Sequence, residues 1–135
     1  MQYKSEEEKQ QVVLYNLQRA DKTLKEAILL ANNQFRNGCA NRLYYAAYYV
    51  VNALLMAHGI VTKTHSGTKS SFSQHFVKTG KFDKTYGRLL SGLFDSRQKG
   101  DYENIFAYDA DSVLPLFEPV AEMITLIEIE IRASN

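Results

Sequence analysis

The segment from Asn41 to His58, which reads NRLYYAAYYVVNALLMAH, constrains the fold more than any other part of the chain. Four of its residues are tyrosines, most of the others are apolar or small, and clearly polar side chains are few. A helix that is apolar on every side must be covered on every side. The unbroken apolar portion is too short to span a bilayer, where tyrosine hydroxyls and an amide would also be costly. We therefore predict a buried central helix in a small helical protein.

Length and composition set the class of protein that we expect. A chain of 135 residues fits one domain, residues 1–135, and a hydrophobic fraction of 45% is typical of a globular chain. The first residues lack the basic-then-apolar pattern of a secretory signal. One cysteine, Cys39, excludes an intrachain disulfide and suits a reducing compartment, and we interpret it as a small packing residue. We expect a cytoplasmic protein without a membrane span.

The first half of the chain predicts two helices. Ser5-Glu-Glu-Glu8 matches a capping box, and apolar residues at helical spacing extend this first helix to about Gln34–Phe35. Arg36-Asn37-Gly38 is then interpreted as the turn before the central helix. That helix is expected to stop at His58-Gly59, where glycine adopts the left-handed conformation that closes many helices.

The second half predicts three more helices. Ser66 or Thr68 caps a third helix that runs to Gly80, and Asp83 caps a fourth. Two glycines inside the fourth helix cost stability, so we expect each to mark a close approach to another helix. These glycines are Gly87 and Gly92.

The end of the chain predicts a loop followed by a last helix. Gly100 is expected to interrupt the fourth helix, with a partly extended loop over residues 101–111. The last helix covers about 112–131, and Pro119 delays or kinks its start. No window alternates with period two, so we expect no sheet. The predicted fold class is all-α, an antiparallel helical bundle of about five helices.

The net charge of +1 hides an uneven distribution of charge. Residues 1–62 carry seven Lys/Arg against five Asp/Glu, residues 63–99 eight against two, and residues 100–135 one against eight. We favour internal pairing between the basic middle and the acidic end. The alternative is an exposed patch for phosphates, formed by Lys63, Lys69, Lys78, Lys81, Lys84 and Arg88.

Several segments in order resemble the HEPN domain, a family named for nucleotide binding in higher eukaryotes and prokaryotes. They are NRLYYAAYYVVNALL at 41–55, Gly59-Ile60, His65-Ser66-Gly67, FVKTGKF at 76–82 and LFDSRQKGDYE at 93–103. The resemblance implies a helical bundle that is commonly a homodimer and is often encoded beside a minimal nucleotidyltransferase. It also implies RNA cleavage or nucleotide-linked regulation, including toxin–antitoxin pairs.

Many HEPN ribonucleases carry the motif R-x4–6-H, which this chain matches only in part. Arg97 takes the arginine position, but Tyr102 stands five residues later and no histidine follows. A phenol can donate a hydrogen bond to phosphate but is a poor general base at neutral pH. The resemblance therefore implies a binding or regulatory module. The alternatives are a metal-independent ribonuclease using Arg97 with Tyr102 or His65, and a nucleotide-binding protein without catalysis.

The central helix also carries a semi-polar stripe at three- and four-residue spacing: Asn41, Tyr45, Tyr48 and Asn52. We favour an internal hydrogen-bond network there, with a groove for a ligand or a second subunit as the alternative. Arg42, at the start of the helix, indicates an anion or an acidic neighbour. His65 contacts either phosphate or its own turn, and Arg97 either phosphate or carboxylates.

The candidate ligand-binding residues are Arg97, Asp101, Tyr102, Asn41, Arg42, Tyr45 and His65. The histidines at 58, 65 and 75 are not spaced as metal ligands on one helix face, and no glycine-rich phosphate loop occurs. We expect no metal and no cofactor. The expected partners are a second copy of the chain, a nucleotidyltransferase-like protein, and RNA or a nucleotide.

Overall fold

The computed structural model describes residues 5–102 and 113–134, of which 36, 37 and 96–102 are described by their backbone alone. Its five α-helices are α1 (Glu6–Asn32), α2 (Arg36–Ala57), α3 (His65–Phe72), α4 (Lys84–Tyr102) and α6 (Phe117–Ala133). A π-helical turn, η1 (Ser73–Val77), continues α3, and a short 3-10 turn, η2 (Leu114–Leu116), precedes α6. These described ranges contain no strand, and the predicted all-α helical bundle is confirmed.

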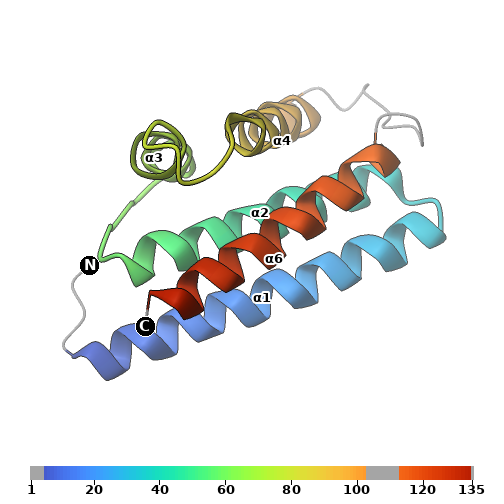
Figure 1. The fold of residues 1–135 in the computed structure, drawn as a ribbon. Coiled ribbons are helices and arrows are strands. Elements are labelled where there is room, and N and C mark those ends of the chain that lie inside the picture. Colours follow the sequence, from blue (N-terminus) through green and yellow to red (C-terminus); the bar gives the residue numbers. More distant parts are fainter. Residues whose placement is uncertain (1–4, 103–112, 135) are drawn as a thin grey trace.

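Helix α2 lies at the centre of the bundle. In Figure 1, α1, α2 and α6 run lengthwise beside one another, and α3 and α4 lie on the other side of α2. α2 and α6 run in the same direction, and both are antiparallel to α1 (Figure 1). α2 packs against each of the other four α-helices. This arrangement explains why its sequence is apolar all round.

Burial of α2 confirms the prediction of a covered central helix. Its fully buried residues cover one broad face of the helix: Cys39, Leu43, Tyr44, Ala46, Ala47, Val50, Val51, Ala53, Leu54 and Leu55. The residues on the remaining face, among them Tyr45, Tyr48, Tyr49, Asn52 and Met56, are partly buried. The alanines allow neighbouring helices to approach, while Leu54, Leu55 and Tyr44 fill the space between them. α6 contributes the facing apolar stripe of Val120, Met123, Ile124, Ile127 and Ile131.

The predicted turn at Arg36-Asn37-Gly38 is wrong, because α2 already begins at Arg36. α1 ends at Asn32, and Gln34 takes the left-handed conformation with φ 67°. The N–H of Phe35 donates to the Leu30 carbonyl at 2.8 Å, which closes a Schellman-type end. A glutamine in this conformation is uncommon, so the sequence did not indicate it.

The other predicted ends of the first two helices are confirmed. The Ser5 hydroxyl accepts a hydrogen bond from the Glu8 N–H at 3.1 Å and caps α1. Gly59 has φ 74° and closes α2, where the Ile60 N–H donates to the Leu55 carbonyl at 2.8 Å. Here glycine supplies the left-handed residue at little steric cost.

Helix α4 begins where the sequence predicted. The Asp83 carboxylate accepts a hydrogen bond from the Thr85 N–H at 2.9 Å, and this bond lowers the pKa of Asp83. A Cβ placed at Gly87 would lie 3.3 Å from a Val77 methyl, so the expected close approach is present there. It is absent at Gly92, where no heavy atom of the described residues lies within 4 Å.

The predicted interruption at Gly100 is wrong. α4 continues through it to Tyr102, so Asp101 and Tyr102 belong to the last turn of a helix. A single glycine costs only about 1 kcal/mol in a helix interior, which the neighbouring turns can offset. The rest of the predicted loop, residues 103–111, lies outside the described residues.

The delayed start of the last helix is confirmed. Pro115 lies in the 3-10 turn, and α6 begins at Phe117 with Pro119 in its first turn. The N–H groups of a first turn have no partner within the helix, so a proline there removes no hydrogen bond.

One acidic pair joins α1 to α6 and gives a testable pH dependence. Burial raises the pKa of Glu128, and the Asp21 carboxyl, which shares a hydrogen bond with it, raises the pKa further. One Glu128 oxygen, Oε1, is buried with no hydrogen-bond partner among the described residues. Because the pKa of Glu128 is higher in the folded state, the free energy of unfolding falls as the pH rises. The fall begins at about 4.3, the pKa in the unfolded state, and continues through the pKa in the folded state.

We expect Glu128→Gln to raise the free energy of unfolding at pH 7 by up to about 1 kcal/mol, since the neutral amide carries no ionisation penalty. The measurement is urea unfolding of both proteins at several pH values. The gain is expected to vanish near about pH 3, where Glu128 is protonated in both states. A gain that is independent of pH would contradict this explanation.

Candidate functional site

His65 is the first residue of α3 and does not lie in a loop as the sequence suggested. The helix starts there because the Thr64 hydroxyl accepts the Gly67 N–H at 2.9 Å, so that Thr64, not Ser66 or Thr68, is the cap. A Cβ at Gly67 would lie 2.9 Å from that hydroxyl. The Thr-His-Ser-Gly sequence thus fixes where the imidazole enters the bundle.

The imidazole of His65 is held by tyrosines of α2. The Tyr44 hydroxyl lies 2.5 Å from Nδ1 of His65, at hydrogen-bond distance. The Tyr48 ring stacks on the imidazole with centroids 4.2 Å apart and an angle of 7°, and Tyr45 meets it edge-on at 5.9 Å. Tyr44 is buried, whereas the other three residues are partly exposed. The histidine is therefore oriented from two sides at the edge of the molecule.

Asn52, another member of the semi-polar stripe, forms part of an internal hydrogen-bond network. The Thr68 hydroxyl, which is buried, donates to the Asn52 side-chain oxygen at 3.3 Å and lies 2.7 Å from the Thr62 hydroxyl. These hydrogen bonds join α2 to α3 about one helical turn after His65. Asn41 is partly exposed near the start of α2.

Arg97, which was predicted to bind phosphate, lies on α4. This helix packs against α2 and α3, the two helices that hold His65 and its tyrosine partners. Nζ of Lys69, one turn after His65, lies 4.5 Å from the centre of the Phe94 ring of α4. The Phe94 ring also meets the Tyr44 ring edge-on at 6.2 Å. Arg97 follows Phe94 by three residues, about one helical turn along α4. The side chains of Arg97, Asp101 and Tyr102 lie outside the described part of the structure.

Arg42 has the acidic neighbour that its position indicated. Its Nε lies 3.7 Å from a Glu26 carboxylate oxygen of α1, in a half-exposed ion pair. About two helical turns further along α2, Arg19 of α1 donates to the Tyr49 hydroxyl at 2.8 Å. This bond is the main cause of the raised pKa of Arg19. Arg42 therefore contacts α1, and no contact among the described residues links it to His65.

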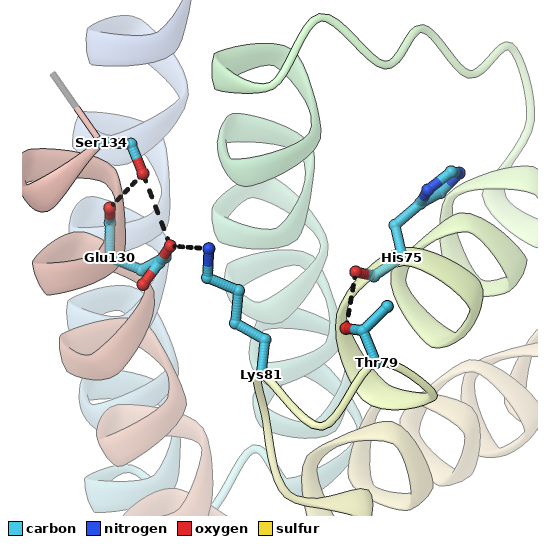
Figure 2. Close-up of polar contacts among 5 residues, drawn as sticks. All are labelled: His75, Thr79, Lys81, Glu130 and Ser134. Atoms are coloured by element: carbon cyan, nitrogen blue, oxygen red, sulfur yellow. Dashed lines mark hydrogen bonds and ion pairs between the residues drawn. The ribbon is translucent and has the colours of Figure 1, made fainter.

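The expected pairing of basic and acidic segments occurs at Lys81. Its Nζ lies 2.6 Å from a Glu130 carboxylate oxygen of α6, as Figure 2 shows. Glu130 in turn accepts hydrogen bonds from the Ser134 hydroxyl (Figure 2). Internal pairing thus accounts for one member of the predicted basic patch. Lys69, Lys78, Lys84 and Arg88 take part in no ion pair within the described ranges.

The junction of α2, α3 and α4 offers chemistry that suits phosphate. An imidazole can donate a hydrogen bond to a phosphate oxygen or transfer a proton near neutral pH. The Lys69 ammonium adds a positive charge one helical turn away. Sequence reasoning named His65 and Tyr45 but missed Tyr44 and Lys69 as parts of one site. The only signal for Tyr44 was its place in the tyrosine run, because its partner is 21 residues away.

Two features are absent from residues 5–102 and 113–134. No group of three or more His, Cys, Asp or Glu residues in these ranges is placed to hold a metal ion. Within them, no helix combines the length and the apolar character that crossing a membrane requires.

The amino-acid sequence matches one family model and is similar to several named proteins. The family model described as "HEPN domain" matches residues 13–130. A "UPF0332 protein" from Thermotoga maritima is 38% identical over 106 residues, which cover 78% of this chain and 80% of that protein. Two proteins from Methanocaldococcus jannaschii share the name "Putative toxin". They are 32% and 31% identical, over 64% and 62% of this chain and 59% and 62% of their own lengths.

Proposed function

Because this chain belongs to the HEPN domain family, we propose that it is the toxin-type member of a two-protein pair, and that it acts by binding RNA. The names of two relatives support the toxin-type assignment. We further propose a nucleotidyltransferase-like protein as its partner and a homodimer as its own state. RNA contact takes place at the junction of α2, α3 and α4, around His65.

The position of His65 carries this proposal. Its imidazole is fixed by the Tyr44 hydroxyl and the Tyr48 ring. It lies beside α4, whose Arg97 follows one turn after Phe94. An oriented imidazole, a lysine and an arginine on adjacent helices suit the recognition of a phosphodiester. Partly exposed aromatic rings beside them suit base stacking.

A second candidate function is RNA cleavage without a metal. The standard motif lacks its histidine, because Tyr102 occupies that position. His65 favours this candidate, since it brings an imidazole to α4 from a different part of the sequence. General acid–base catalysis by a positioned histidine typically contributes about 10²–10⁴-fold to a rate.

The test uses the full chain and a labelled single-stranded RNA. Binding is measured by fluorescence anisotropy, and cleavage by gel separation of the products. We expect His65→Ala and Arg97→Ala each to weaken binding by about tenfold, which corresponds to about 1.4 kcal/mol. His75→Ala is the matched control, because His75 is exposed on η1.

The outcomes separate the two candidates. RNA binding without cleavage products, weakened in both site variants and unchanged in His75→Ala, supports a binding module. Products that disappear in both site variants would support the ribonuclease. Equal binding by all four proteins, or no RNA binding by the unaltered chain, would refute the proposed site.

A further inference from the structure

A groove of about 520 Å³ lies between α3–η1 on one side and α4 on the other, and we call it the α3–α4 groove. Four cationic residues line it, Lys69, Lys78, Lys84 and Arg88, and no Asp or Glu is among its described lining residues. Three serines and Gln74 add hydrogen-bonding groups. The groove is therefore both positively charged and rich in groups that can donate to oxygen.

The π-helical turn η1 aligns the residues with which α3 and η1, the first wall of the groove, line it. They come as pairs four residues apart, 69/70, 73/74 and 77/78. In a regular α-helix, each step of four residues rotates a side chain by about 40°, so the last pair would turn away from the first. η1 covers residues 73–77, and the Lys78 N–H bonds to the Ser73 carbonyl, five residues back, at 2.8 Å. This wider turn offsets the rotation and keeps Lys78 on the side of Lys69.

The second wall is regular and lies close to the first. Lys84, Gly87, Arg88 and Ser91 recur at three- and four-residue spacing along α4. Gly87 has no side chain where the Val77 methyls approach, which lets η1 pack closely on α4. Asp83 is the acidic residue nearest to this wall in the sequence. Its carboxylate accepts a hydrogen bond from the Thr85 N–H at the end of the wall.

The groove leads to the His65 site. Lys69 lines the groove and also meets Phe94 in the junction that holds the imidazole. A track of cations that ends at partly exposed aromatic rings is the arrangement with which proteins hold single-stranded nucleic acid. A row of cations on two facing walls fits a chain of phosphates better than one phosphate.

We propose that the α3–α4 groove binds the phosphodiester backbone of single-stranded RNA and leads the strand to His65. This inference rests on the proposed function and adds the path of the strand. Lys69 and Lys78 are nine residues apart, about 13 Å along the helix axis, which is long enough for several phosphates in sequence. Lys81 lies outside this track, because it pairs with Glu130.

The experiment compares two double variants with the same change in net charge. Lys78→Gln with Arg88→Gln removes one exposed cation from each wall of the groove. Lys22→Gln with Lys25→Gln removes two exposed cations from α1. Binding of the labelled single-stranded RNA is measured from low to moderate salt. Thermal unfolding checks that both variants are folded.

We expect the groove variant to bind roughly tenfold more weakly at about 0.1 M salt, and the α1 variant to bind within about twofold of the unaltered chain. The slope of log affinity against log salt is expected to become shallower by about 1.4, or about 0.7 for each phosphate that the groove no longer neutralises. Equal weakening in both variants would show that net charge alone acts, and would overturn the proposal.

Three further outcomes separate this inference from the proposed function and from other phosphate ligands. Binding that is lost in His65→Ala but kept in the groove variant would overturn the groove and leave the proposed function standing. No RNA binding by the unaltered chain would overturn both. Unlabelled RNA is expected to displace the probe, and ATP at equal phosphate concentration is not. Equal displacement by ATP would overturn the proposed RNA path and assign the groove to nucleotides instead.

Discussion

Leu54→Ala is expected to lower the free energy of unfolding by about 2–5 kcal/mol. Leu54 is 0% exposed in the central helix, which packs against all four other α-helices. Truncation there removes the transfer free energy of three carbons and leaves a cavity that several helices would have to move to fill. Typical domains have about 5–15 kcal/mol of stability, so a large part of the total is at stake. Urea unfolding followed by circular dichroism measures the change.

Leu29→Ala is the matched control for this prediction. The substitution is the same and also lies in a helix, but Leu29 is 63% exposed on α1. Its expected effect is within about 0.5 kcal/mol. Comparable destabilisation at the two positions would contradict the central place of α2.

Tyr44→Ala is expected to cost about 3–5 kcal/mol, the usual range for a buried aromatic residue. Tyr44 is 1% exposed, and its ring meets those of Tyr45, Tyr48, His65 and Phe94. Tyr44→Phe keeps these ring contacts and removes only the hydroxyl that bonds to His65. It is expected to cost only about 0.5–1.5 kcal/mol, because water reaches the partly exposed imidazole.

The conservative variant separates stability from function at this site. Under the proposed function, Tyr44→Phe is folded but weakens RNA binding, because the imidazole then lacks the hydrogen bond that helps to orient it. Combined with His65→Ala, it is expected to weaken binding little further, since the two residues act as one unit. Tyr15→Phe, at an exposed tyrosine of α1, serves as the control. Full additivity of Tyr44→Phe and His65→Ala would show that the bond does not position the histidine for binding.

Two helix ends of one type show what local sequence can and cannot reveal. α1 and α2 both end with a left-handed residue followed by a bond from an N–H to the carbonyl five residues back. At α2 the left-handed residue is Gly59, and the end was predicted. At α1 it is Gln34, which carries no such signal, so the turn was placed too late in the chain. The strain at Gln34 is offset by the packing of α1 on α2, which no local pattern reports.

In the candidate site, too, some features could be predicted from the sequence and others only became visible in the packed fold. His65 and Arg97 were singled out from sequence, one in a predicted loop and one near a helix end, and were paired only in the ribonuclease alternative. Only the packing of α3 and α4 on one side of α2 brings His65 to the helix that carries Arg97 (Figure 1). The cationic residues of the α3–α4 groove were named in the sequence only as members of a possible exposed basic patch for phosphates. Nothing in the sequence indicated the π-helical turn that keeps Lys69 and Lys78 on one side.

Local sequence was enough to establish the all-α class, the buried tyrosine-rich helix, the caps at Ser5, Asp83 and Gly59, and the resemblance to the HEPN family. Most of these follow from periodicity and from bonds between residues at most five apart, whose energies depend little on the rest of the chain. The packed fold was needed to establish the partner of His65, the pairing of Lys81 with Glu130 and the walls of the groove. Those contacts join residues far apart in sequence or on opposite helices, and their geometry exists only once the helices have packed.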